Sequence, residues 1–220
     1  NGAWVINMSF GKSFSPEKRW VDDAVKYAES KGVLLVHAAG NDHKDVDVEE
    51  NYPNNRYGND PATRAGNWVT VGASGPDNHE LVAEFSNYGK NDVDLFSPGV
   101  KIYSTLPGGN AYGNQQGTSM ATPVVAGVAA LVLSYYPELS ARQVKMVLER
   151  SAQPAKGVKA IKPGTEVEVP LSELSRTGGI VNAYEAIKLA GTIKGERKLA
   201  PSPAPAPTPK TTLKKKPVKG

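Results

Sequence analysis

The chain has 220 residues, a formal net charge of +4 and no cysteine. This length suffices for one domain with its own core, while the lack of cysteine excludes disulfides, thiol catalysis and cysteine-based zinc sites. The positive charge is concentrated in residues 191–220, so the rest of the chain is mildly acidic and lacks the basic surface typical of nucleic-acid binding.

The first predicted element is a buried parallel strand over residues 4–8, where apolar and β-branched residues follow one another. Ser15 precedes Pro16 and an acidic residue, a pattern that predicts the cap of a helix ending near Gly32. Residues 33–36 form a second predicted buried strand. A strand, a helix and a strand in this order predict a right-handed crossover in a parallel sheet.

Two more strands are predicted further along the chain. A polar stretch over residues 42–67 reads as a long surface loop, and residues 68–73 and 93–96 are apolar, strand-like runs. The expected fold class is therefore α/β, with three layers and a mostly parallel sheet that carries helices on both faces.

The stretch over residues 119–136 is apolar on nearly every side, which predicts a helix buried in the middle of the protein. Pro123 is expected in about the first turn, where the missing N–H costs nothing. Ser140 begins a capping box for the next helix, and Asn182 is a predicted cap for a last helix that ends near Ala190.

The remaining segments have weaker patterns. Residues 166–171 alternate like an exposed strand within an insertion-like segment, 154–176, to which we assign no function. Residues 191–220 are predicted to be a disordered tail rich in proline, alanine and lysine, which follows the folded body of residues 1–190. The tail has no aromatic residues to stack bases, so we expect no nucleic-acid partner. The longest apolar run, 124–133, is too short to span a bilayer, and no signal peptide is visible.

The strongest chemical signal is the heptapeptide Gly117-Thr118-Ser119-Met120-Ala121-Thr122-Pro123. It presents Ser119 at the amino end of a buried helix, where the helix dipole and free N–H groups favour negative charge. Gly117 leaves room for a substrate backbone to approach. Taken alone, the same pattern also fits a serine that only caps its helix.

The heptapeptide resembles the signature around the active-site serine of the subtilisin-like serine peptidases (subtilases, peptidase family S8). Residues 85–89, 93–99 and 102–107 resemble the segments that precede this serine in the family, in the same order. The similarity covers residues 3–190. It implies a serine endopeptidase that acts through an acyl-enzyme on Ser119, with residues 1–190 forming the C-terminal part of the catalytic domain.

The resemblance extends to an oxyanion hole and to substrate-binding segments. It implies that Asn41, after a buried strand and Gly40, donates to the tetrahedral intermediate together with the Ser119 N–H; a simple turn-forming Asn is the competing interpretation. It also implies that two segments pair with an extended peptide and form the walls of an open, apolar specificity pocket for large hydrophobic residues. These substrate-binding residues are Ser9, Phe10, Gly11, Ala38, Ala39 and Gly40.

A general base is missing from this pattern. The chain has three histidines, His37, His43 and His79, and none has the family's catalytic context. The resemblance implies that the catalytic Asp and His lie upstream of Asn1, so that the upstream half of the domain is a required partner and residues 1–220 alone are inactive. A catalytically dead subtilisin-like binding domain remains the alternative, as does binding of acidic polymers or membranes through the basic tail. An α/β-hydrolase is disfavoured because Gly-x-Ser-x-Gly does not occur.

No cofactor is required by this chemistry, and no metal ligand is assigned. Subtilases often bind structural calcium, but the acidic loop with Asp42, Asp45, Asp47, Glu49 and Glu50 fits no specific ligand spacing. The resemblance implies peptide or protein substrates and a secreted or cell-envelope location.

Overall fold

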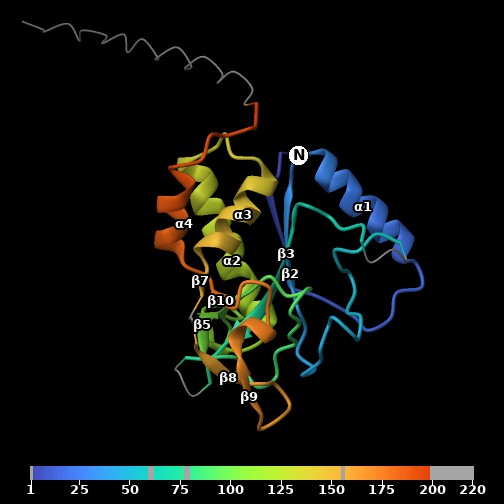
Figure 1. Ribbon diagram of the computed structural model, residues 1–220, viewed down its shortest axis with the longest axis vertical. Helices are drawn as coiled ribbons and strands as arrows, with labels where there is room; N and C mark the ends of the chain where they lie inside the picture. The colour runs from blue at the N-terminus through green and yellow to red at the C-terminus, as the bar shows by residue number, and fades with distance from the viewer. Residues whose placement is uncertain (1, 59–61, 77–79, 155–156, 199–220) are drawn as a thin grey trace, which may run out of the picture.

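The computed structural model describes residues 2–58, 62–76, 80–154 and 157–198, arranged around one central sheet (Figure 1). The sheet has six strands in the order β1-β2-β3-β4-β10-β7. Neighbouring strands from β1 to β10 are parallel, and β7 is antiparallel to β10. The strands are β1 (Val5–Met8), β2 (Leu34–Ala38), β3 (Trp68–Ser74), β4 (Leu95–Pro98), β10 (Gly179–Ile180) and β7 (Gln153–Pro154).

Helices cover both faces of the sheet, which confirms the predicted α/β class (Figure 1). Helix α1 (Lys18–Ser30) packs on one face through a cluster that includes Val25 and Trp68. The other face carries α2 (Thr118–Tyr135), α3 (Ala141–Ser151) and α4 (Ala183–Ala190), whose side chains share the largest core cluster with β2, β3 and β4.

Helix α2 is the centre of this core, as its all-round apolar pattern predicts. Ala121, Val125, Ala129 and Val132 are fully buried in the cluster that also contains the strands. Within the described residues, α2 has the length and hydropathy that a membrane-crossing helix needs. A buried core helix has the same properties, and the packing of α2 against four strands corresponds to that case.

The predicted helix caps are confirmed at two of three places. Ser140 and Gln143 form a reciprocal capping box at the start of α3, and Asn182 accepts the N–H of Glu185 at 3.0 Å at the start of α4. The predicted Ser15 cap is wrong, because α1 begins at Lys18 and is preceded by Glu17, with no side-chain hydrogen bond at that end.

Strand β1 differs from the prediction of a buried strand. It is the outermost strand of the sheet and pairs with β2 alone. Ile6 is therefore 39% exposed, and Trp4 just before the strand is exposed to a similar extent. The apolar sequence predicts the strand itself correctly, but burial depends on the neighbours that the sheet provides.

The segment before α4 folds into short elements. β8 (Lys159–Ile161) and β9 (Glu168–Pro170) form an antiparallel hairpin, followed by the 3-10 helix η1 (Leu171–Glu173). The predicted exposed strand corresponds to β9. A second hairpin of β5 (Ile102–Thr105) and β6 (Tyr112–Gln115) precedes α2.

The predicted boundary of the folded body at residue 190 is too early. Ile193 packs against the main core, and the Arg197 N–H donates to the Glu138 carbonyl at 2.7 Å. The Arg197 guanidinium also lies 4.4 Å from the centre of the Trp4 ring. The ordered body thus extends through residue 198, and the rest of the predicted tail, 199–220, lies outside the described residues.

Candidate active site

A cleft of about 360 Å³ opens where β1, β2 and the first turn of α2 meet. Clefts beyond the carboxyl ends of parallel strands are the usual ligand sites of such sheets. It brings together most of the predicted site residues. Those lining it are Phe10, Gly11, Lys12, Ser13, Ala38, Gly40, Asn41, Asp42, Lys44, Asn51, Thr118 and Ser119. Of the other predicted residues, Ser9 contacts Ser119 directly and Ala39 is buried behind the wall.

Ser119 is the second residue of α2 and stands in the first turn, where backbone N–H groups have no partner within the helix. The preceding Gly117 has φ +145°, a conformation that residues with a Cβ rarely adopt. Its N–H donates to the carbonyl of Gly99 at 2.8 Å, which fixes the turn into the helix. The sequence thus places a serine hydroxyl at a positive helix end, in contact with solvent in the cleft.

Ser119 and Ser9 exchange two hydrogen bonds. The Ser119 hydroxyl donates to the Ser9 carbonyl at 3.2 Å, and the Ser9 hydroxyl donates to the Ser119 carbonyl at 2.8 Å. The second bond compensates for Pro123, which has no N–H to offer the carbonyl four residues earlier. The prediction that Pro123 costs nothing is therefore corrected: it lies beyond the first turn of α2, and Ser9 supplies the missing donor.

Asn41 is held by its amide oxygen. That oxygen accepts the Thr118 N–H at 2.9 Å and the Thr118 hydroxyl at 3.0 Å, so the Nδ2 group is left for other partners. The position where a Cβ of Gly117 would stand lies 3.6 Å from Asn41 Nδ2 and 3.7 Å from the Ser119 nitrogen. The Asn41 amide, whose Oδ1 atom is also 3.7 Å from this point, and the Ser119 nitrogen therefore border one small volume beside the serine.

The two described histidines have backbone carbonyl oxygens as partners. His37 on β2 is 2% exposed, and its Nε2 atom lies 2.8 Å from the Phe10 carbonyl oxygen. Burial lowers the pKa of His37 to about 4, against a weaker opposing effect of that hydrogen bond. His43 has its Nδ1 atom 2.7 Å from the Glu84 carbonyl oxygen, and His79 lies outside the described residues. The Ser119 hydroxyl donates to the Ser9 carbonyl, not to either of these histidines.

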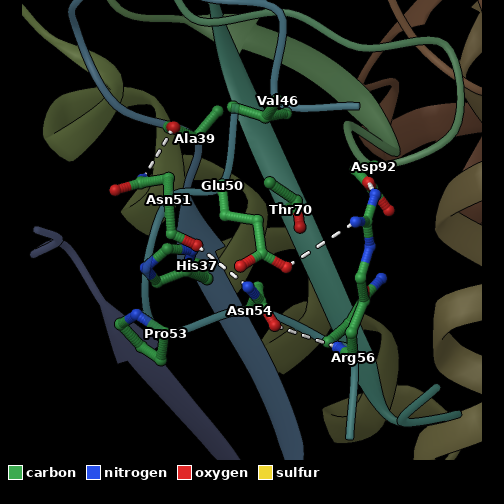
Figure 2. Close-up of a pocket in the computed structure, with 11 residues that line it drawn as sticks. His37, Ala39, Val46, Glu50, Asn51, Pro53, Asn54, Arg56, Thr70 and Asp92 are labelled. Carbon is green, nitrogen blue, oxygen red and sulfur yellow. Dashed lines mark hydrogen bonds and ion pairs between the residues drawn. The ribbon is translucent and has the colours of Figure 1, made fainter. Parts of the chain in front are cut away.

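Figure 2 shows the surroundings of His37 behind the cleft, where a cavity of about 20 Å³ has space for roughly one water. Asn51 closes the side toward the cleft and donates from Nδ2 to the Ala39 carbonyl at 2.9 Å. On the opposite side Arg56 contacts Asp92 and lies 3.8 Å from Glu50. The polar groups around His37 are therefore engaged with one another.

Carboxylates of the acidic loop have partners within the protein. Asp47 accepts N–H groups from Asn91 and Asp92, and Glu49 pairs with Lys44 at 2.8 Å. In the described ranges, no group of three or more His, Asp or Glu side chains converges as metal ligands. The Asp47 carboxylate joins the loop to the segment before β4, whereas the Glu49 carboxylate pairs within the loop.

Sequence reasoning missed three polar residues of the site. Thr118 orients Asn41, and Asn51 reaches into the cleft from the long polar loop. Buried Asn87 donates to the Ala39 carbonyl and accepts the N–H groups of Asp42 and Lys44, each at 2.9 Å. Thr118 was inside the recognised heptapeptide, but nothing local distinguishes Asn51 or Asn87 from other asparagines in loops.

Comparison with protein families gives one match that covers most of the chain. A model described as the subtilase family, Peptidase_S8, matches residues 1–178.

Curated relatives include M-protease of Shouchella clausii (strain KSM-K16), which is 41% identical over 152 residues, or 69% of this chain and 35% of that protein. Subtilisin E of Bacillus subtilis (strain 168) is 42% identical over 155 residues, 69% of this chain and 36% of the relative. Subtilisin Savinase of Lederbergia lenta is 40% identical over 152 residues, 69% of this chain and 50% of the relative. The aligned part spans about a third to a half of their length.

The solved structures that match this chain also include proteases. A protease from Pseudoalteromonas arctica PAMC 21717 matches with a TM-score of 0.65 and 31% identity, over 86% of this chain and 52% of that one. The self-cleaved protease domain of PatA matches with a TM-score of 0.62 and 28% identity, over 87% of this chain and 63% of that domain.

Proposed function

The chain belongs to the subtilase family, and from this premise we propose that its folded body is the C-terminal part of the catalytic domain of a serine endopeptidase. The observation that carries the proposal is the position of Ser119 in the cleft, in the first turn of α2 and beside the Asn41 amide. The substrates are peptides or proteins, and the reaction is hydrolysis through an acyl-enzyme on Ser119.

In this mechanism the Ser119 oxygen attacks the scissile carbonyl while its proton passes to a base. The carbonyl oxygen becomes an oxyanion, which the Ser119 N–H and Asn41 Nδ2 stabilise. Thr118 makes this possible at low cost, because it fixes the Asn41 amide before the charge develops. The segment Ser9–Gly11 pairs with the extended substrate, and water later releases the acyl group.

The base and its orienting acid are proposed to be a His and an Asp supplied by an upstream segment of the same catalytic domain. His37 is locked in the core, and the Ser119 hydroxyl donates to Ser9 in place of a base. An apolar groove of about 530 Å³ between β1 and α1 supports a missing neighbour on this side. Three large exposed apolar side chains line it: Ile6, Phe10 and Trp20.

The nucleophile is tested by labelling the complete protein with a fluorophosphonate probe. We expect covalent label at Ser119, and Ser119→Ala to abolish both labelling and peptide hydrolysis. Ser104→Ala, on the exposed hairpin strand β5, is the matched control and should change neither. Label on another serine, with Ser119 free, contradicts the assignment, and retained peptide binding without any labelling favours the noncatalytic alternative.

The missing base is tested by complementation. Residues 1–220 alone should hydrolyse no chromogenic peptide, and addition of the upstream half, in cis or as a separate polypeptide, should restore turnover. Hydrolysis by the isolated chain that disappears in Ser119→Ala would show that a histidine of this chain serves as the base.

We also propose that the protein acts outside the cytoplasm, secreted or in the cell envelope, on the basis of its family resemblance. Helix α2 is then a core helix and not a membrane span, since its buried side chains pack on the sheet. Fractionation of cells that produce the complete protein tests both points, because a membrane-inserted α2 would keep the protein in the membrane fraction.

A further inference from the structure

A second cavity, of about 440 Å³, has a basic lining. It lies between the start of β1, the end of α1 and the beginning of α3, next to the last described residues (Figure 1). Because it is at the amino end of β1, it is separate from the cleft with Ser119, which opens beyond the carboxyl end. The lining residues are Trp4, Lys31, Gly32, Ser140, Ala141, Arg197 and Lys198, of which three carry a positive charge and none a negative one.

Within the described ranges, the three cations of this cavity have no ion-pair partner. None of the ion pairs there involves Lys31, Arg197 or Lys198. The carboxylate of Glu196, beside the cavity, instead accepts the Ser140 hydroxyl at 3.2 Å. Like charges that share one small space repel one another, so an anion placed between them lowers the energy of all three.

Arg197 is held in place while its guanidinium keeps free donors. The guanidinium lies 4.4 Å from the centre of the Trp4 ring and donates from Nη2 to the Gly32 carbonyl at 3.1 Å. A guanidinium has five N–H groups in a planar fork that matches the two oxygens of an acid group. Partial burial lowers the pKa of Arg197, and a bound anion would offset this loss of hydration.

We propose that this cavity binds an acidic polysaccharide, with an acid group of the polymer seated between Lys31, Arg197 and Lys198. The volume is that of a small ligand site and accommodates a sugar residue together with its acid group. Trp4 is 38% exposed and offers apolar surface to the C–H groups of a sugar ring. The residues that follow Lys198 add five lysines and no acidic residue, which matches a partner whose charges repeat along a chain.

Other anionic partners fit these features less well. A nucleic acid would need aromatic rings for its bases, but the Trp4 ring is already stacked with Arg197, and residues 199–220 contain no aromatic residue. A membrane presents a flat surface, whereas the cations here line a hollow. A concave site takes up a group that projects from a polymer better than it takes up the plane of a bilayer.

The site is tested on the complete protein with polygalacturonate, a carboxylate polymer, and with dextran as the neutral control. Isothermal titration calorimetry should show binding of polygalacturonate that weakens as salt is added, and no binding of dextran. A protein with both Lys31→Gln and Lys198→Gln should bind about tenfold more weakly, because two exposed charges lose their partners. Ser119→Ala should bind as wild type does, since the inference does not depend on the peptidase function.

The matched control removes two exposed lysines that lie outside this cavity. Lys90→Gln with Lys101→Gln causes the same change of net charge, and its affinity should stay within about twofold of wild type. All four substitutions are at exposed positions, so melting temperatures close to that of wild type should show that each fold is intact.

Three results would overturn the proposal. Equal affinities of wild type and the protein with Lys31→Gln and Lys198→Gln would remove the cavity from the interaction. Binding that disappears on deletion of residues 199–220, yet is insensitive to the two substitutions, would assign the polymer to that segment alone. Tighter binding to vesicles of anionic lipid or to polyuridylate than to polygalacturonate would show that the partner belongs to another class.

Discussion

The hydroxyl of Ser9, which follows β1, takes the place of a backbone N–H that is missing from α2. Ser9 donates to the Ser119 carbonyl, which Pro123 leaves without its usual partner. Asn7 donates in turn to the Ser9 hydroxyl at 3.0 Å, which holds it in this orientation. The position of Ser119 thus depends on a residue 110 positions earlier in the chain.

This dependence is testable as a double-mutant cycle on stability. Ser9→Ala should lower the unfolding free energy by roughly 1–3 kcal/mol, because a carbonyl in the helix loses its donor. In a Pro123→Ala background the new N–H at position 123 satisfies the same carbonyl, so Ser9→Ala should cost measurably less. Urea denaturation of the four proteins gives the coupling energy. Equal costs in both backgrounds would show that Ser9 does not compensate for the proline.

Asn41 has a kinetic prediction of its own. Asn41→Leu should lower kcat by about 10²–10³-fold, the loss known for this type of donor in subtilisin itself, with little change in KM. The donor is needed once the oxyanion forms, so it favours the transition state over the bound substrate. Steady-state kinetics on the complete protein decide the matter, and an effect confined to KM would assign Asn41 to substrate binding or turn shape.

Among the residues of the candidate site, the sequence predicted only those that belong to a recognised pattern. Ser119 and Asn41 were predicted from the heptapeptide and the turn, and the structure brings both into one cleft. Asn51 was not found, because its contacts with Gly11 and Ala39 join segments that only the folded sheet brings together. Whether a loop asparagine reaches a cleft depends on loop conformation, which local propensity does not determine.

The elements are tied together by buried charge as well as by apolar packing. Asp94, just before β4, is 1% exposed and accepts the Thr70 N–H from β3 at 2.7 Å. Lys145 of α3 donates to the same carboxylate at 2.9 Å, and Arg176 lies 3.3 Å from it. This carboxylate therefore connects two strands, one helix and the segment before β10.

Removal of this carboxylate should be costly. Asp94→Ala is expected to lower the unfolding free energy by about 3–5 kcal/mol, because Lys145 and the Thr70 N–H lose a buried partner. The control is Glu185→Ala, which breaks the exposed pair with Lys188 and should cost less than about 1 kcal/mol. Thermal or urea unfolding measures both, and similar small losses would show that Asp94 is not a structural link.

Element prediction succeeded where periodicity and caps were strong. The apolar run of α2 and the caps at Ser140 and Asn182 are confirmed, because these signals act within a few residues. The burial of β1 was wrong, since an apolar strand is buried only if another strand or helix covers it. The hairpin of β5 and β6 was not predicted, and its polar, exposed residues explain why.

For the whole molecule, buried His37 and half-buried Glu149 give opposite dependences of stability on pH. Burial lowers the pKa of His37 to about 4 from 6.5, so the unfolded chain binds more protons between these values and stability rises with pH. Burial, opposed by Lys145, raises the pKa of Glu149 to about 7 from 4.5. The folded protein then binds more protons over that range, and stability falls as pH rises.

Glu149→Gln should therefore reveal how much His37 contributes to the pH dependence of stability. Between pH 4.5 and 6.5 the two slopes oppose each other in wild type, whereas the variant should gain stability with rising pH more steeply. The integrated His37 effect is of the order of 3 kcal/mol. Melting temperatures at several pH values across this range test the prediction, and parallel curves for the two proteins would contradict it.

The contact between Arg197 and Trp4 determines where the folded body can carry an attached group. Trp4 precedes β1, so this contact lies at the amino end of the strand, whereas the cleft opens beyond its carboxyl end. Residue 198 thus lies at the end of the body opposite to Ser119. A label attached at residue 198 would therefore stand clear of a large substrate in the cleft.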